Sequence, residues 1–337
     1  MSIENSHRPV LQRLSIGDLP LEGGGAIEDC WLGWTEHGLA DPDAPVAVAL
    51  CAIGSNHERM EFLMGPGLPL DTTRLRILCI NALGNGLCSS PSNSRTQAAS
   101  HFPRFTIRDM VASQSRLLDQ LGIGRLDLVA GASMGGMQAL QWGVSHPDRM
   151  ARIVALSPLA KTPGWTAAVN ELARRALQAA PDTAHAWESW TLVMQLLAVR
   201  TPQQVNAEIA DAASLPAWLE KRAREWASRG FAPLDWVYQS LAYDAHDVGT
   251  TAGFHGDTQA ALASIRARTL VLTAGLDLYN PGACAQWAAG QIPDCTYAEL
   301  DSDWGHFTFS AADTDHAALL RQHISQFLWA SEGNTKP

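Results

Sequence analysis

The stretch LDLVAGASMGGMQAL, residues 126–140, changes character at a single serine. A short aliphatic run leads up to Ser133, and a run of helix-forming residues follows it. This pattern predicts a buried strand that ends at the serine and a helix that begins after it. Gly131 and Gly135 complete a G-x-S-x-G motif, which in a strand–turn–helix context is typical of a nucleophile elbow. The alternative interpretation is a glycine-rich turn that carries an incidental serine.

Similar aliphatic runs lie on both sides of this motif and have the character of buried parallel strands. They cover residues 44–54, 75–83, 152–157 and 268–275, with a further short run at 295–300. Residues 106–123 place their apolar side chains on one helical face, and Thr106 with Asp109 forms a helix start signal. Alternation of strands and helices predicts an α/β fold with a mostly parallel, doubly wound sheet.

The alternation stops between residues 161 and 245, where no strand-like run occurs. Five helical stretches rich in Ala, Leu and Trp fill this interval, at about 167–180, 186–199, 203–213, 215–228 and 233–243. We therefore expect residues 1–160 and 246–337 to form the α/β core, and residues 161–245 to form an inserted, all-helical lid.

Composition excludes several classes of function. The 337 residues are 46% hydrophobic and carry a formal net charge of −10, which argues against a partner such as nucleic acid or an anionic membrane. The N-terminal residues lack the pattern of a signal peptide, and no apolar run approaches the ~18 residues of a membrane span. The six cysteines lack metal-ligand spacing, so we expect reduced thiols in a cytoplasmic protein and no metal site.

A serine nucleophile needs a base and an acid that orients it, and after a nucleophile elbow these follow in the chain order acid, then histidine. Asp277 follows the strand predicted at 268–275, and His306 follows the run at 295–300. The predicted catalytic residues are therefore Ser133, Asp277 and His306. His255 is the rival base, although it breaks the chain order, and Asp301 and Asp303 are rival acids very close to His306 in sequence.

An acyl-transfer site also needs two backbone N–H groups for the oxyanion that forms. One is expected from Met134, the residue after the nucleophile. The other is expected from the loop after the strand at 44–54, where Ile53 is the candidate donor and Gly54 lets the chain turn close to the site.

Several blocks of the chain resemble the homoserine O-acetyltransferases of the α/β-hydrolase superfamily. These blocks are GPGLPLDTTR (65–74), NALGNG (81–86), FPRFTIRDMVASQSRLLDQLGI (102–123), GASMGGMQALQW (131–142) and NELARRALQAAPD (170–182). The resemblance implies the α/β-hydrolase fold, a Ser–Asp–His triad at Ser133, Asp277 and His306, and an acyl-serine intermediate. It also implies a homodimer formed through the lid helices, with no cofactor other than acetyl-CoA as cosubstrate of a transferase.

The chain departs from this family where the substrate is held. The usual H-A-L-T-G stretch is CAIGS (51–55), and Phe307 stands where members carry an Asp that holds the amino group of homoserine. The family's lid arginine for the substrate carboxylate aligns with residues 189–199, which contain no arginine. Unpaired buried charges are costly, so we expect an apolar pocket formed by Phe307, Trp304 and Gly54, with no arginine reaching it.

The predicted function is serine-dependent acyl transfer, and the first choice is hydrolysis of a small, largely uncharged ester. The alternatives are an O-acetyltransferase that uses acetyl-CoA with an acceptor other than homoserine, and a non-catalytic protein of the same fold that binds a small ligand.

Overall fold

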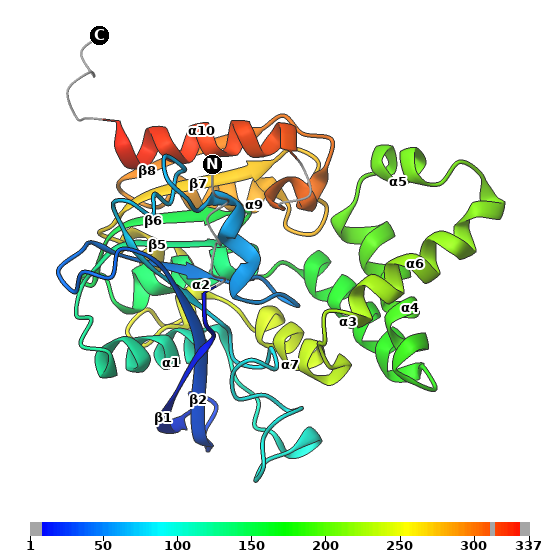
Figure 1. Ribbon diagram of the computed structural model, residues 1–337, viewed down its shortest axis with the longest axis horizontal. Helices are drawn as coiled ribbons and strands as arrows, with labels where there is room; N and C mark the ends of the chain where they lie inside the picture. Colours follow the sequence, from blue (N-terminus) through cyan, green and yellow to red (C-terminus); the bar gives the residue numbers. More distant parts are fainter. Residues whose placement is uncertain (1–8, 311–313, 331–337) are drawn as a thin grey trace, which may run out of the picture.

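The computed structural model describes residues 9–310 and 314–330 and is built around one eight-stranded sheet (Figure 1). The strands are β1 (Gln12–Pro20), β2 (Ala26–Gly38), β3 (Val46–Leu50), β4 (Arg76–Ile80), β5 (Leu126–Ala132), β6 (Met150–Leu156), β7 (Arg268–Ala274) and β8 (Cys295–Leu300). The helices outside residues 161–245 are α1 (Ile107–Gln120), α2 (Met134–Ser145), α8 (Thr258–Ala263), α9 (Gly282–Ala289) and α10 (Thr314–Trp329). Two 3-10 helices are also used below, η1 (His57–Leu63) and η6 (Gly305–Phe309).

The strand order is β1-β2-β4-β3-β5-β6-β7-β8, and all pairs from β4 to β8 are parallel. This confirms the predicted doubly wound α/β sheet. Strands β1 and β2 were not predicted; they pair antiparallel with each other, and β2 pairs antiparallel with β4. Both sequences mix charged and apolar residues. β1 is the edge strand of the sheet and is interrupted by an irregularity at Gly17, whereas β2 lies between β1 and β4.

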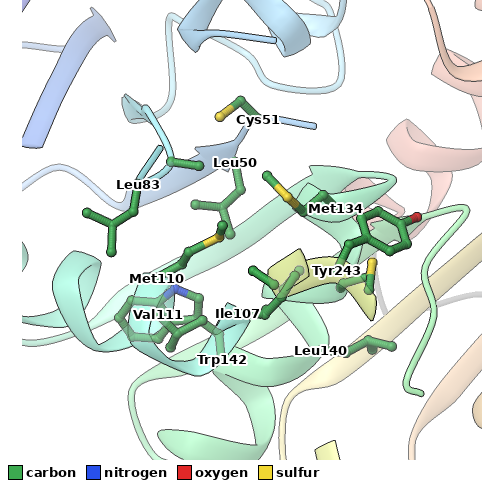
Figure 2. Packing of buried hydrophobic residues seen from close by; sticks show 14 of the residues in the cluster. Leu50, Cys51, Leu83, Ile107, Met110, Val111, Met134, Leu140, Trp142 and Tyr243 are labelled. Carbon is green, nitrogen blue, oxygen red and sulfur yellow. The ribbon is translucent and has the colours of Figure 1, made fainter. Parts of the chain in front are cut away.

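Alternate residues of the parallel strands pack on opposite faces of the sheet. One face carries Val48 and Leu50 of β3 and is covered by α1 and α2. The other carries Ala47 and Ala49 and packs against η1 and α10. Figure 2 shows the first of these cores, in which side chains of α1 and α2 meet the end of β3. The labelled residues are Leu50, Cys51, Leu83, Ile107, Met110, Val111, Met134, Leu140, Trp142 and Tyr243.

Helix α1 begins as the sequence predicts. The Thr106 side chain accepts from the Asp109 backbone N–H, and the Asp109 carboxylate accepts from the Thr106 backbone N–H, which forms a capping box. Asp109 also accepts from the backbone N–H of Glu22, so the same carboxylate ties the helix start to the segment between β1 and β2.

Residues 161–245, called here the helical insertion, connect β6 to the short α8 that precedes β7 and contain no strand. The insertion consists of α3 (Gly164–Ala179), α4 (Thr183–Met194) continued by a π-helical turn (Gln195–Val199), α5 (Pro202–Glu208), α6 (Leu215–Ala227) and α7 (Pro233–Asp244). These helices gather on one side of the sheet (Figure 1). Among the described residues no helix is both long and apolar enough to span a bilayer.

Candidate functional site

Four loops that follow parallel strands meet at one edge of the sheet. The loop after β3 carries Ile53, the turn after β5 carries Ser133, the loop after β7 carries Asp277, and η6 after β8 carries His306. In a parallel sheet the carboxyl ends of the strands lie at the same edge, which is where such folds place their ligands. The topology alone therefore brings together residues that lie far apart in the sequence.

Ser133 sits on a strained turn between β5 and α2. Its backbone has φ 55° and ψ −120°, a conformation that a residue with a side chain rarely adopts, and only 2% of the residue is exposed. A Cβ on Gly131 would lie 2.3 Å from the backbone of Gly135, and one on Gly135 would lie 2.4 Å from the carbonyl oxygen of Leu50. Both glycines of the motif are needed because the turn presses β5, α2 and β3 together.

Ser133, His306 and Asp277 form one continuous hydrogen-bonded chain. His306 Nδ1 lies 2.8 Å from Asp277 Oδ2, and His306 Nε2 lies 2.9 Å from Ser133 Oγ. A carboxylate only accepts hydrogen bonds, so the neutral imidazole donates from Nδ1 to Asp277 and accepts the Ser133 hydroxyl proton at Nε2. The predicted chain order of the three residues is thus matched by their contacts in space.

The Asp277 carboxylate is fully buried and has further donors besides His306. Its Oδ1 accepts from the backbone N–H groups of Tyr279 and Asn280, at 3.0 and 2.9 Å, and its Oδ2 also accepts from the Ser157 hydroxyl. The Asn280 side chain donates to the Ser157 carbonyl, and the Tyr243 hydroxyl donates to the Asn280 carboxamide oxygen. These donors compensate the buried negative charge and fix its direction.

The rival residues lie elsewhere. His255 is exposed, in the loop before α8, and Asp301 is exposed at the end of β8. Asp303 contributes its backbone carbonyl to the Thr201 hydroxyl, and no hydrogen bond joins its carboxylate to His306 within the described chain. Ser157, Asn280 and Tyr243 were not singled out from the sequence, because isolated Ser, Asn and Tyr residues form no recognisable motif.

Near Ser133, the backbone N–H groups of Met134 and Ile53 have no acceptor in the part of the chain that the structure describes. The next two N–H groups of the same loop are engaged, since Gly54 N–H donates to Gln239 Oε1 and Ser55 N–H donates to the carbonyl of Ala52. Buried donors without partners are rare, and here they flank the serine. The side chain of Met134 itself points into the core (Figure 2).

A cavity of about 120 Å³ opens above Ser133 and His306. The β3 loop and η6 form its core side, and residues of the helical insertion form the other side. Aromatic side chains dominate the latter: Trp190 lies 4.3 Å from Trp226 and 5.7 Å from Trp236, measured between ring centroids. The lining residues are Ala52, Ile53, Gly54, Ser55, Arg59, Ser133, Trp190, Met194, Gln195, Val199, Trp226, Arg229, Trp236, Tyr279, His306, Phe307 and Ser310.

The expected pocket residues are found there in part. Phe307 and Gly54 line the cavity, whereas Trp304 does not, since it precedes the helical turn that carries His306 and Phe307 toward the serine. The expectation that no arginine reaches the cavity is wrong, because Arg59 of η1 and Arg229, just beyond α6, both line it. Neither position was considered, since η1 and the end of α6 lie far from the motif in sequence.

The other arginines of the helical insertion are engaged in ion pairs, among them Arg174 and Arg200. Arg174 contacts Asp244 at 2.6 Å, and Arg200 pairs with Glu208 while its guanidinium lies 4.9 Å from the centre of the Phe307 ring. Neither is among the residues that line the cavity. The charge at the cavity therefore comes from the two arginines that the sequence did not point to.

Comparison with known proteins places this geometry in a family. The model of the alpha/beta hydrolase fold family matches residues 37–312. The homoserine O-acetyltransferase of Clavibacter michiganensis is 30% identical over 89% of this chain and 89% of its own length. The solved acetyl esterase MekB is 25% identical and has a TM-score of 0.87, covering 98% of this chain and 99% of its own. An acetylester hydrolase from Corynebacterium glutamicum has a TM-score of 0.86 at 24% identity, covering 95% and 96% of the two chains.

The matched region contains all four loops of the site, and the similarity to the acetyltransferase extends over nearly the whole chain. The protein therefore belongs to the alpha/beta hydrolase fold family and, within it, to the acyl-transferring or ester-hydrolysing enzymes related to the homoserine O-acetyltransferases.

Proposed function

We propose that the protein hydrolyses a small ester through an acyl-enzyme, with Ser133 as nucleophile, His306 as general base and acid, and Asp277 as the residue that orients His306. The observation that carries this proposal is the unbroken chain of hydrogen bonds from Asp277 through His306 to Ser133 at the floor of a cavity. A serine hydroxyl becomes an effective nucleophile when a positioned base accepts its proton.

In the acylation step, Ser133 Oγ attacks the ester carbonyl carbon while its proton passes to His306 Nε2. The carbonyl oxygen becomes an oxyanion, for which the free N–H groups of Met134 and Ile53 are the available donors. His306 then protonates the leaving alkoxide, the ester C–O bond breaks, and the acyl group stays on Ser133. Asp277 remains ionised and stabilises the imidazolium.

In the deacylation step, a water molecule takes the place of the departed alcohol. His306 accepts a proton from the water as its oxygen attacks the acyl carbon, and the carboxylic acid leaves when the proton returns to Ser133 Oγ. The cavity of about 120 Å³ suits a short acyl chain. The likeness to an acetyl esterase at 25% identity over 98% of the chain supports water as the acceptor.

The helical insertion acts as a lid in this proposal. Its residues Trp190, Met194 and Trp226 form the apolar wall opposite the β3 loop. Such a wall restricts the water around the reacting atoms and strengthens the electrostatic interactions there.

The alternative function is O-acetyl transfer from acetyl-CoA to an alcohol, supported by the similarity to a homoserine O-acetyltransferase over 89% of the chain. The same serine, histidine and carboxylate would carry it, with an alcohol replacing water in the second step. The departures at Phe307 and at residues 189–199 argue against homoserine as the acceptor.

The test follows the acyl group. We expect p-nitrophenyl acetate to release p-nitrophenol and free acetate, and added alcohols or CoA to leave the yield of acetate unchanged. Ser133→Ala should abolish turnover, whereas Ser264→Ala, which removes a hydroxyl at the end of α8, should not. Efficient acetylation of homoserine from acetyl-CoA at sub-millimolar concentration, without hydrolysis, would favour the transferase instead.

A further inference from the structure

The cavity above Ser133 has an electrostatic character opposite to that of the chain. The sequence contains 34 acidic and 24 basic residues, yet the described residues that line the cavity include two arginines and no aspartate or glutamate. Arg59 is half-buried in the wall formed by η1, and Arg229 is exposed where the helical insertion borders the cavity. One positive charge therefore belongs to the α/β core and the other to the insertion.

Neither guanidinium has a hydrogen bond or an ion pair with any part of the chain that the structure describes. Arg229 contacts an aromatic ring, since its guanidinium carbon lies 4.5 Å from the centre of the Trp226 ring. Arg59 has no such contact among the described residues. Nearby acidic side chains are engaged elsewhere: Glu225, which faces Arg229, pairs with Arg222 at 2.8 Å. The absence of partners is unusual for a half-buried arginine such as Arg59.

The two arginines repel each other. Burial and, to a smaller extent, the nearby charge of Arg229 together lower the pKa of Arg59 to about 10. The Cys51 thiol is no counter-ion at neutral pH, because burial raises its pKa to about 12. Both arginines thus stay protonated near neutral pH, and neither charge has a counter-ion among the described residues.

We propose that Arg59 and Arg229 form an anion subsite, and that the substrate of this enzyme carries an acidic group which they hold while its ester faces Ser133. This inference rests on the proposed function, and it replaces the expectation of an uncharged ester. A carboxylate suits the fork of donors that each guanidinium presents, and an anion between the two would relieve their repulsion. It would also join the core to the insertion over the reacting ester.

The same cavity offers no counter-ion to an ammonium group among its described lining residues. Its described lining has no carboxylate, and Phe307 lines it at the position directly after His306. An amino acid substrate would bury a positive charge next to two arginines, which is unfavourable. The subsite therefore selects an acidic ester without an amino group.

Three esters that share the 4-acetoxybutanoyl chain separate these charge states. They are 4-acetoxybutanoate, its methyl ester, and O-acetyl-L-homoserine, which adds an ammonium group to the first. We expect kcat/KM for 4-acetoxybutanoate to exceed that for either of the others by roughly tenfold or more, since a charge-assisted pair at a partly buried site has this magnitude. The preference should shrink in 1 M NaCl, because salt screens the exposed Arg229 most.

Variants assign the preference to the two arginines. Arg59→Gln should lower kcat/KM for the anionic ester about ten- to a hundredfold, chiefly through KM, and leave the methyl ester within about threefold. Arg59→Lys should retain part of the preference, and Arg229→Gln should have a smaller effect because the group is more exposed. Arg175→Gln is the matched control: it removes a lid charge whose side chain is 74% exposed and which does not line the cavity.

The acid could lie on the acyl side of the ester instead of the alcohol side. Comparing mono-p-nitrophenyl succinate with p-nitrophenyl acetate tests for an acid on the acyl side. A preference for the anionic ester, on the acyl or the alcohol side, that is lost in Arg59→Gln supports the subsite. Equal turnover of charged and neutral esters on both sides, a preference unchanged in Arg59→Gln, or a preference for O-acetyl-L-homoserine would overturn it.

A binding measurement keeps this inference separate from the catalytic proposal. Calorimetric titration of Ser133→Ala with 4-acetoxybutanoate should show binding that the double variant Ser133→Ala/Arg59→Gln lacks and that the methyl ester does not match. This result would stand even if no ester were turned over by the parent protein. Binding of the neutral and anionic esters with equal affinity would reject the subsite whether or not the enzyme is an esterase.

Discussion

Replacing Asp277 by asparagine changes one oxygen to an NH₂ group and alters the proton arrangement of the whole hydrogen-bonded chain. Oδ1 of Asp277 accepts from two backbone N–H groups, so the asparagine oxygen must stay on that side. The NH₂ group then faces His306 Nδ1. Two donors cannot share this contact, so the imidazole is driven to the tautomer that carries its proton on Nε2.

That tautomer cannot accept the proton of Ser133. The opposite orientation of the asparagine would set its NH₂ group against the N–H groups of Tyr279 and Asn280, leaving three buried donors without acceptors, at about 1–3 kcal/mol for each. We therefore expect kcat to fall by roughly 10³–10⁴, equivalent to about 4–5.5 kcal/mol of activation free energy. The Ser157 hydroxyl can rotate to accept from the new NH₂ group, so the fold should be retained.

The assay is steady-state hydrolysis of p-nitrophenyl acetate, with circular dichroism to confirm folding. Asp303→Asn is the control, because its carboxylate is not bonded to His306 and its variant should stay within about threefold of the parent. Retention of more than a tenth of the parent kcat in Asp277→Asn, or a larger loss in Asp303→Asn, would refute the assigned role of Asp277.

Three further changes test the support around the site. Gly135→Ala places a Cβ 2.4 Å from a carbonyl oxygen of β3 and should cost roughly 1–3 kcal/mol of unfolding free energy together with most of the activity, while Gly164→Ala meets nothing within 4 Å and should change stability by less than about 0.5 kcal/mol in urea unfolding. Ser157→Ala removes one donor to the carboxylate that faces the histidine and should lower kcat about tenfold; an unchanged kcat would show that this hydroxyl is dispensable. Burial raises the pKa of Asp235, which accepts from Ser92, to about 6, so the folded state holds this proton more tightly than the unfolded state and stability should fall by roughly 2–3 kcal/mol as the pH rises from 4 to 7. Asp235→Asn should flatten that part of the stability profile, and an equally steep profile in the variant would contradict the assignment.

The motif around Ser133 and the order of the predicted strands were sufficient to predict the parallel part of the sheet and the loops that meet at its edge. Strand period, the capping box at Thr106 and the glycines of the elbow are local signals, and each reflects a local physical constraint. Strands β1 and β2 escaped prediction because neither has a continuous apolar run. β1 is the edge strand of the sheet, and β2, which pairs with β1 and β4, interrupts its apolar residues with charged ones.

The contacts between side chains around the site could not be predicted from local sequence patterns. The Ser157 hydroxyl bonds a carboxylate 120 positions away in the chain, and the Asn280 side chain bonds a carbonyl 123 positions away, which no local pattern reveals. Arg59 and Arg229 reach the cavity because η1 and the end of α6 fold toward it. No pattern in the sequence indicates that either segment approaches Ser133. Absence of an arginine from residues 189–199 was a correct observation, but it said nothing about arginines that arrive from other elements.

The central claim is that Ser133 carries the acyl group, and covalent labelling tests it most directly. A fluorophosphonate mimics the tetrahedral intermediate and reacts with a serine only when its hydroxyl is activated. Intact-mass measurement and peptide mapping should show one phosphonyl group per chain, on Ser133, and esterase activity should fall as the label accumulates. Ser133→Ala should not be labelled, and His306→Ala should be labelled more slowly than the parent. A label on another serine, or full activity in a protein labelled at Ser133, would contradict the account.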